Sequence, residues 1–290
     1  MPERMVKVDD ATLCVETFGD PADPAILLLG GAASAMDFWD TEFCRALADA
    51  GRHVVRYDNR DTGRSTNYPA GEPGYTGTTL VTDALGLLDA LGIARAHLVG
   101  VSMGGGIAQQ IGIEHPGRVA SLTLIETSPA PARPDGADPL PPPEARIRAL
   151  FGDPEPAPDW TDRSAAIDRV VRDLATFGGS VTLDDARARA LATRVYDRTI
   201  DFAASQTNHW ILEGGPGVRG GLGDITAPTL VLHGTEDPFF PLGHGEALAR
   251  EIPGARFVPL PGVGHEYPPP QVWPIVVPAI IAVTGVDGVT

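Results

Sequence analysis

The sequence is poor in cysteine, in basic residues and in long apolar runs. Its only cysteines, Cys14 and Cys44, lack the paired spacing and the nearby histidines of a disulfide framework or a zinc site. With 22 Lys and Arg against 38 Asp and Glu, the net charge is -16, which would repel nucleic acid or an anionic membrane. The longest apolar stretches, at 26–33 and 272–283, are too short or too interrupted by proline to span a bilayer. We therefore expect neither nucleic acid nor a membrane as partner, and both cysteines as small buried side chains.

The length and composition predict one large α/β domain with an insertion. A chain of 290 residues that is 43% hydrophobic can build a core of that size. Residues 1–4 are not followed by the apolar segment of a secretory signal, so we expect a cytoplasmic location. The oligomeric state stays open, because no single apolar stripe stands out.

Short apolar segments of strand length alternate with segments of helical periodicity along most of the chain. This order predicts a mainly parallel sheet that is covered by helices on both faces. We expect residues 12–18 to form an antiparallel edge strand. The other expected strands are 25–29, 53–57, 96–99, 119–125, 229–233 and 256–260, and the expected helices include 39–50, 80–91, 242–252 and 271–283.

A change of composition marks an insertion. Between residues 128 and 223 the chain is rich in proline and glycine around three helical pieces, at 165–177, 183–196 and 200–212. We predict a helical cap over 128–223 and a core domain made of 1–127 and 224–290. The last helical piece carries Phe202, His209 and Trp210. These side chains are candidates for a substrate pocket, although they would equally serve to attach the cap to the core.

One short motif points to a reactive residue. Gly100-Val101-Ser102-Met103-Gly104 follows a buried strand and opens a helix, which is the pattern of a nucleophile elbow. A serine at the tip of such a turn needs small residues two positions before and after it, because a side chain there would meet the returning backbone. The first amides of the helix also favour negative charge above the hydroxyl. We therefore predict Ser102 as a nucleophile.

Two further residues complete a catalytic triad in the chain order Ser, acid, His. Asp237 lies at the carboxyl end of the strand 229–233, and His265 follows the last strand. The carboxyl ends of parallel strands share one edge, so we expect both beside Ser102. An imidazole would take the serine proton and an ionised carboxylate would orient the imidazole. Glu236 and Glu126 are the alternatives for the acid.

Of the other histidines, only His209 and His244 compete with His265, and neither follows the final strand. The negative charge of an acyl-transfer intermediate needs two backbone donors. We predict the amide of Met103 as one donor. The other comes from the small residues after the strand 25–29, where we choose Ala32, with Gly31 as the second choice.

Together these motifs resemble the α/β-hydrolase superfamily over nearly the whole chain. The resemblance rests on Gly30-Gly31, the Ser102 elbow, the stretch 233–238 and Gly264-His265. It implies an α/β-hydrolase fold, with an eight-stranded, mainly parallel sheet flanked by helices and a cap inserted after strand 6. The stretches 18–24 and 56–65 are similar to those of aclacinomycin methylesterases, which remove a methyl ester from an anthracycline polyketide. Many relatives carry a histidine where this chain has Gly30.

The resemblance also narrows the reaction. Relatives that open haloalkanes or epoxides use an Asp nucleophile, and position 102 is Ser. We expect a serine esterase that cleaves a carboxylic ester through an acyl-enzyme, without a metal or an organic cofactor. A methyl ester of a polyketide-like or other small hydrophobic substrate is the expected substrate. Carbon–carbon bond hydrolysis, lactone hydrolysis and cofactor-free perhydrolysis use the same triad and stay open. A small-molecule receptor on this fold is the alternative from another class.

Overall fold

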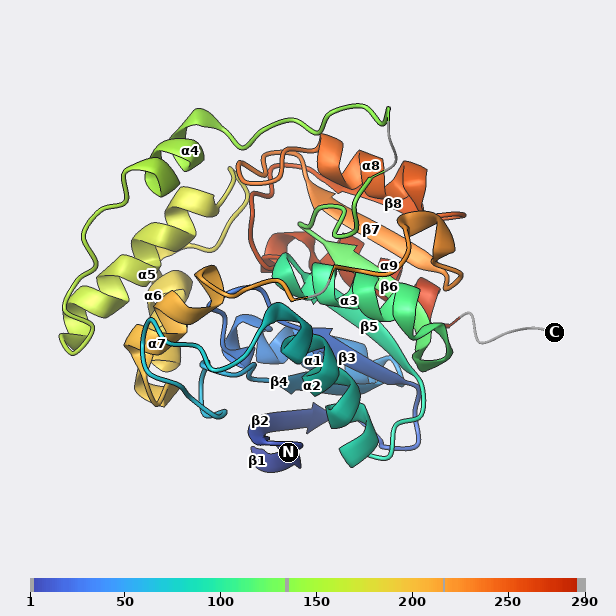
Figure 1. Ribbon diagram of the computed structural model, residues 1–290, viewed down its shortest axis with the longest axis horizontal. Helices are drawn as coiled ribbons and strands as arrows, with labels where there is room; N and C mark the ends of the chain where they lie inside the picture. The colour runs from blue at the N-terminus through green and yellow to red at the C-terminus, as the bar shows by residue number, and fades with distance from the viewer. Residues whose placement is uncertain (1–2, 134–135, 216, 286–290) are drawn as a thin grey trace.

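A computed structural model describes residues 3–133, 136–215 and 217–285 of the chain (Figure 1). Residues 1, 2, 134, 135, 216 and 286–290, which fall within the predicted core and cap ranges, lie outside the described residues. The centre of the molecule is an eight-stranded sheet in the order β1-β2-β4-β3-β5-β6-β7-β8. Strand β2 pairs antiparallel with β1 and β4, and the pairings from β4 to β8 are parallel. The predicted eight-stranded, mainly parallel sheet is thus confirmed.

The strands in the middle of the sheet are buried along almost their whole length. Such strands read as continuous apolar runs, since helices cover both faces of a parallel sheet. The bounds of β3, β4 and β8 agree with the predicted ranges. In chain order the strands are β1 (Arg4–Val8), β2 (Ala11–Phe18), β3 (Ala25–Leu29), β4 (His53–Tyr57), β5 (Ala96–Val101), β6 (Val119–Ile125), β7 (Thr229–Gly234) and β8 (Arg256–Leu260).

The prediction that residues 12–18 form the edge of the sheet is wrong. The edge strand is β1, which folds back on β2 through a tight hairpin that pairs Val8 with Ala11. Asp9 in this turn has a positive φ of 47°, a conformation that aspartate tolerates in turns. The charged side chains of β1 face solvent, and such side chains protect an edge from pairing with another chain.

Helices cover the sheet on both faces. On one face α2 (Gly77–Ala90), α3 (Met103–Glu114) and α8 (Gly243–Glu251) pack their apolar sides against a continuous core. On the other face α1 (Thr41–Asp49) and α9 (Trp273–Thr284) enclose a second core. None of the helices within the described ranges combines the length and the apolar character that a bilayer crossing demands.

Four helices stand between β6 and β7 and lie together to one side of the sheet (Figure 1). We call them the cap helices: α4 (Ala145–Gly152), α5 (Arg163–Phe177), α6 (Asp185–Arg198) and α7 (Phe202–Thr207). The sequence did not predict α4. Helix α7 is shorter than the expected 200–212, and a 3-10 turn at Asn208–Trp210 follows it. The division of the chain at residues 128 and 223 stays a prediction.

Candidate active site

Ser102 stands at the tip of a sharp turn between β5 and α3. Its backbone has φ 53° and ψ -117°, a strained conformation for a residue with a side chain. A Cβ added at Gly100 would lie less than 3.0 Å from backbone atoms of Gly104, and one added at Gly104 would meet the backbone of Leu29 equally closely. The two glycines are therefore needed for steric reasons, as expected for a nucleophile elbow.

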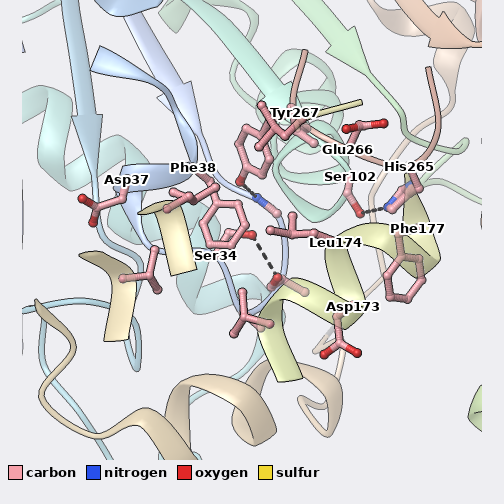
Figure 2. A pocket seen from close by; sticks show the side chains of 18 of the residues that line it. Ser34, Asp37, Phe38, Ser102, Asp173, Leu174, Phe177, His265, Glu266 and Tyr267 are labelled. Atoms are coloured by element: carbon pink, nitrogen blue, oxygen red, sulfur yellow. Dashed lines mark hydrogen bonds between the residues drawn. The ribbon is translucent and has the colours of Figure 1, made fainter. Parts of the chain in front are cut away.

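The structure brings Ser102, His265 and Asp237 into one hydrogen-bonded row. His265 Nε2 lies 3.0 Å from Ser102 Oγ, a bond that Figure 2 marks with a dashed line. On the other side of the ring, His265 Nδ1 lies 2.8 Å from Asp237 Oδ2. The Asp237 carboxylate can only accept, so Nδ1 donates to it and Nε2 is left to accept the serine proton. The backbone N–H of His265 also donates to the carbonyl of Phe177 at the end of α5. This bond joins the loop after β8 that carries His265, which we call the histidine loop, to the cap helices.

Asp237 is held by several donors. Its side chain is fully buried, and its Oδ1 accepts the backbone N–H groups of Phe239 and Phe240, each at 2.8 Å. Burial by itself raises the pKa of the Asp237 carboxyl. The imidazoles of His265 and His233 and the backbone donors outweigh burial and lower the pKa below its usual value. The carboxylate is therefore ionised at neutral pH, as the orienting acid of a triad must be.

The two alternative acids lie in different surroundings. Glu236 is exposed and accepts hydrogen bonds from the amide and hydroxyl of Ser180, away from His265. Glu126 is completely buried beneath the triad, and both of its oxygens accept the N–H of Gly234 at 2.8 Å. Burial raises the pKa of Glu126 well above its usual value, and the charge of Asp237 adds to the rise. Burial and the Asp237 charge thus disfavour ionisation of Glu126, and the hydrogen bonds and imidazoles around Asp237 favour the negative charge there.

Glu126, His233 and Asp237 offer ligand atoms within 4.8 Å of one another, a spacing that suits a metal ion. Each atom, however, already serves another bond. Glu126 accepts from Gly234, Asp237 accepts from His265, and His233 Nε2 donates to the carbonyl of Phe240 at 2.6 Å. A metal ion there would break the row that orients His265. We interpret the cluster as the hydrogen-bonded support of the triad.

The loop after β3 lies against the elbow. A Cβ added at Gly31 would contact Ser102 Cβ at 3.6 Å, so the loop backbone borders the serine. The amide of Gly31 donates to the hydroxyl of Tyr267 at 2.7 Å, whereas the amide of Ala32 donates to no acceptor within the described ranges. Of the two predicted loop donors, Ala32 is thus the amide left for a ligand. The amide of Met103 opens α3 beside Ser102.

A cavity of about 450 Å³ opens above Ser102 and His265, between the loops at the sheet edge and the cap helices (Figure 2). Four of the charged side chains that line it are paired: Arg169 with Asp173 at 2.9 Å and Arg194 with Asp37 at 3.0 Å. Their charges offset one another. Asp40, Arg187 and Glu266 also line the cavity, and most of the remaining lining is aromatic or aliphatic. The aromatic lining includes Phe38, Phe177, Trp210, Phe239, Tyr267 and Trp273.

The three predicted pocket residues do not all reach this cavity. Trp210 lines it and is 49% exposed. Phe202 instead packs among the cap helices, with ring centroids 4.9 Å from Tyr196 and 5.7 Å from Trp160. His209 is buried, where its Nδ1 accepts the amide of Ala33. The expectation that Phe202 and His209 line the pocket is corrected, because both side chains are used in holding the cap and the β3 loop.

Sequence reasoning missed several aromatic residues of the cavity. Phe239 directly follows Asp237-Pro238, and Tyr267 comes two residues after His265, so their nearness to the predicted triad was a usable signal. Phe177 had no such signal. It reaches the site because the end of α5 packs on the histidine loop, which is a tertiary contact.

Comparison with known proteins agrees with this architecture. Residues 24–267 match the family described as the alpha/beta hydrolase fold. The chain is 34% identical over 282 residues to rhodomycin D methylesterase DauP of Streptomyces sp. (strain C5). The aligned region covers 92% of this chain and 93% of that protein. The chain is 33% identical to rhodomycin D methylesterase DnrP of Streptomyces peucetius, with the same coverage. The solved structure of the esterase RhEst1 from Rhodococcus sp. ECU1013 matches with a TM-score of 0.74 at 21% identity, over 99% of this chain and 100% of that one. The chain belongs to the α/β-hydrolase fold family.

Proposed function

We propose that this protein is a serine esterase that hydrolyses the methyl ester of a multi-ring aromatic compound. The observation that carries the proposal is the row of hydrogen bonds from Ser102 through His265 to Asp237 at the base of an aromatic cavity. The two methylesterases of 33% and 34% identity support the choice of ester. A cytoplasmic location stays a prediction from the sequence.

The proposed reaction proceeds through an acyl-enzyme. Ser102 Oγ attacks the ester carbonyl while His265 Nε2 takes its proton, and the amides of Ala32 and Met103 stabilise the oxyanion. The alcohol leaves with the proton from His265. A water molecule activated by the same imidazole then releases the acid. The nucleophile, the base and the orienting acid are all side chains of this chain, so the reaction requires no cofactor.

The surroundings of His265 favour a small alcohol. The alcohol receives its proton from Nε2 and must therefore leave beside the imidazole. The rings of Phe239 and Phe177 lie there, with centroids 5.0 Å and 6.3 Å from the imidazole. We propose that these two rings, which line the cavity beside His265, favour a small alkoxy group at this position. The aromatic surface elsewhere in the cavity suits a flat, apolar acyl group.

The test compares wild type with Ser102→Ala on methyl esters of aromatic polycyclic acids and on a p-nitrophenyl ester. We expect wild type to release methanol and the free acid, and Ser102→Ala to lose at least about 10⁴-fold in kcat. Ser205→Ala, which removes a buried serine hydroxyl outside the cavity lining, serves as the control and should keep its activity. Hydrolysis by Ser102→Ala at the wild-type rate would refute the proposal.

A further inference from the structure

The loop between β3 and α1 is held at alternate amides. The N–H of Gly31 donates to Tyr267 Oη at 2.7 Å, as Figure 2 shows, and the N–H of Ala33 donates to His209 Nδ1 at 3.0 Å. Between them, the N–H of Ala32 meets no acceptor in the part of the chain that the structure describes. The bound amides belong to the Gly30–Gly31 and Ala32–Ala33 peptide planes. These planes flank the one that carries the N–H of Ala32 and so restrict the direction of that N–H.

This loop would not hold its shape by itself. Ala33 has a φ of 57°, which lies in the left-handed region that residues with a Cβ seldom adopt. Such a conformation persists only when the surrounding structure enforces it. The bond from Ala33 to His209 is one such constraint, and it comes from a residue 176 positions away in sequence.

His209 is arranged to accept and not to donate at Nδ1. Its Nε2 lies 2.9 Å from the carbonyl oxygen of Arg60, which can only accept, so Nε2 carries the hydrogen. Nδ1 is then left with a lone pair for the amide of Ala33. Burial lowers the pKa of His209 to about 4, so the imidazole is neutral at neutral pH.

Tyr267 connects the histidine loop with the β3 loop. Its ring packs edge-on against Trp39, with centroids 4.9 Å apart, and also contacts Phe38 at 5.4 Å. These contacts hold the hydroxyl beside Gly31. Because Tyr267 is two residues from His265, one short segment positions both the proposed base and the proposed oxyanion donor.

We propose that Tyr267 and His209 are positioning residues that direct the amide of Ala32 toward the reacting carbonyl oxygen, an inference that rests on the proposed esterase function. Neither side chain takes part in the chemistry. Both act through the backbone of residues 31–33, and both lie far from that loop in sequence.

The first test is Tyr267→Phe, which removes the hydroxyl and keeps the ring. Removing an oxyanion donor costs about 10²- to 10³-fold in kcat, so misdirecting one should cost about 10- to 100-fold, with little change in KM. The affinity for a trifluoromethyl ketone, which forms a tetrahedral oxyanion on the serine, should fall by the same factor as kcat/KM. Tyr57→Phe is the matched control. Its hydroxyl is buried and has no partner among the described residues, so kcat should be unchanged.

The second test separates the two nitrogen positions of His209. In His209→Asn the side-chain oxygen can occupy the place of Nδ1 and accept from Ala33. In His209→Gln the amide reaches only the place of Nε2, opposite the carbonyl of Arg60. We expect His209→Asn to keep a kcat at least about 10-fold higher than His209→Gln, at similar thermal midpoints. Equal kcat values in the two variants would contradict the inference.

Ser102→Ala in the same assay distinguishes the possible failures. If it stays fully active, the esterase function and the positioning roles are both refuted. If Ser102→Ala is inactive while Tyr267→Phe matches wild type in kcat and in trifluoromethyl ketone affinity, the esterase function stands and the positioning role of Tyr267 is refuted.

Discussion

Replacing Asp237 with asparagine should reverse the hydrogen bonding of His265. Asp237 Oδ1 accepts two backbone N–H groups, those of Phe239 and Phe240, at 2.8 Å each. An NH₂ group at that position would face two donors, so the asparagine oxygen should occupy it. The asparagine NH₂ then faces His265 Nδ1, where the carboxylate oxygen now accepts.

The imidazole must then accept at Nδ1 and carry its hydrogen on Nε2. In that tautomer it cannot take the proton of Ser102, which lies 3.0 Å from Nε2. The same reversal in a serine protease triad lowers kcat about 10⁴-fold, which corresponds to about 5.4 kcal/mol in the barrier. We expect a loss of this size in Asp237→Asn, with a KM close to that of wild type.

Two measurements check this prediction. Steady-state kinetics on an ester gives the loss in kcat, and NMR of the ¹⁵N-labelled histidine reports which ring nitrogen is protonated. Glu236→Gln is the control, because the neighbouring carboxylate bonds only to Ser180 in the described structure. An Asp237→Asn enzyme within 10-fold of the wild-type kcat, or one with His265 still protonated at Nδ1, would refute the reasoning.

Two further predictions concern stability. Burial raises the pKa of Glu126 in the folded protein. The contribution of this carboxyl to the free energy of unfolding is therefore complete at a pH below its usual pKa and is lost as the pH rises through the raised pKa. Glu126→Gln should therefore unfold at higher denaturant concentration than wild type on the alkaline side, and parallel stability curves from about pH 5 to about pH 9 would contradict this. Arg198→Met leaves the fully buried Asp58 without its cation, which should cost about 3–5 kcal/mol in urea unfolding. The exposed Arg163 is the control, because Arg163→Met should shift the urea midpoint little. A shift in Arg198→Met as small as that in Arg163→Met would contradict the prediction.

Local signals were sufficient to predict the sheet and the sharp turn that carries Ser102. Apolar runs with sharp ends indicated β3, β4 and β8. Gly100 and Gly104 indicated the turn at Ser102, because that turn leaves no space for a Cβ at either position. The edge strand β1 was missed because its charged residues obscure a short run of alternating valines. Helix α4 was missed because proline and glycine dominate the segment around it.

The sequence by itself determined that Ser102, Asp237 and His265 meet at one place, since each follows a recognisable strand and parallel strands end at one edge of the sheet. Only the tertiary structure decided how the loop after β3 is held and what lines the cavity. Gly31 and Tyr267, which share a hydrogen bond, are 236 residues apart in the sequence. Phe202 and His209 contact the cap and the loop after β3 instead of lining the cavity. Side chains on inserted helices are placed by packing over the sheet, and their own local sequence carries no record of that packing.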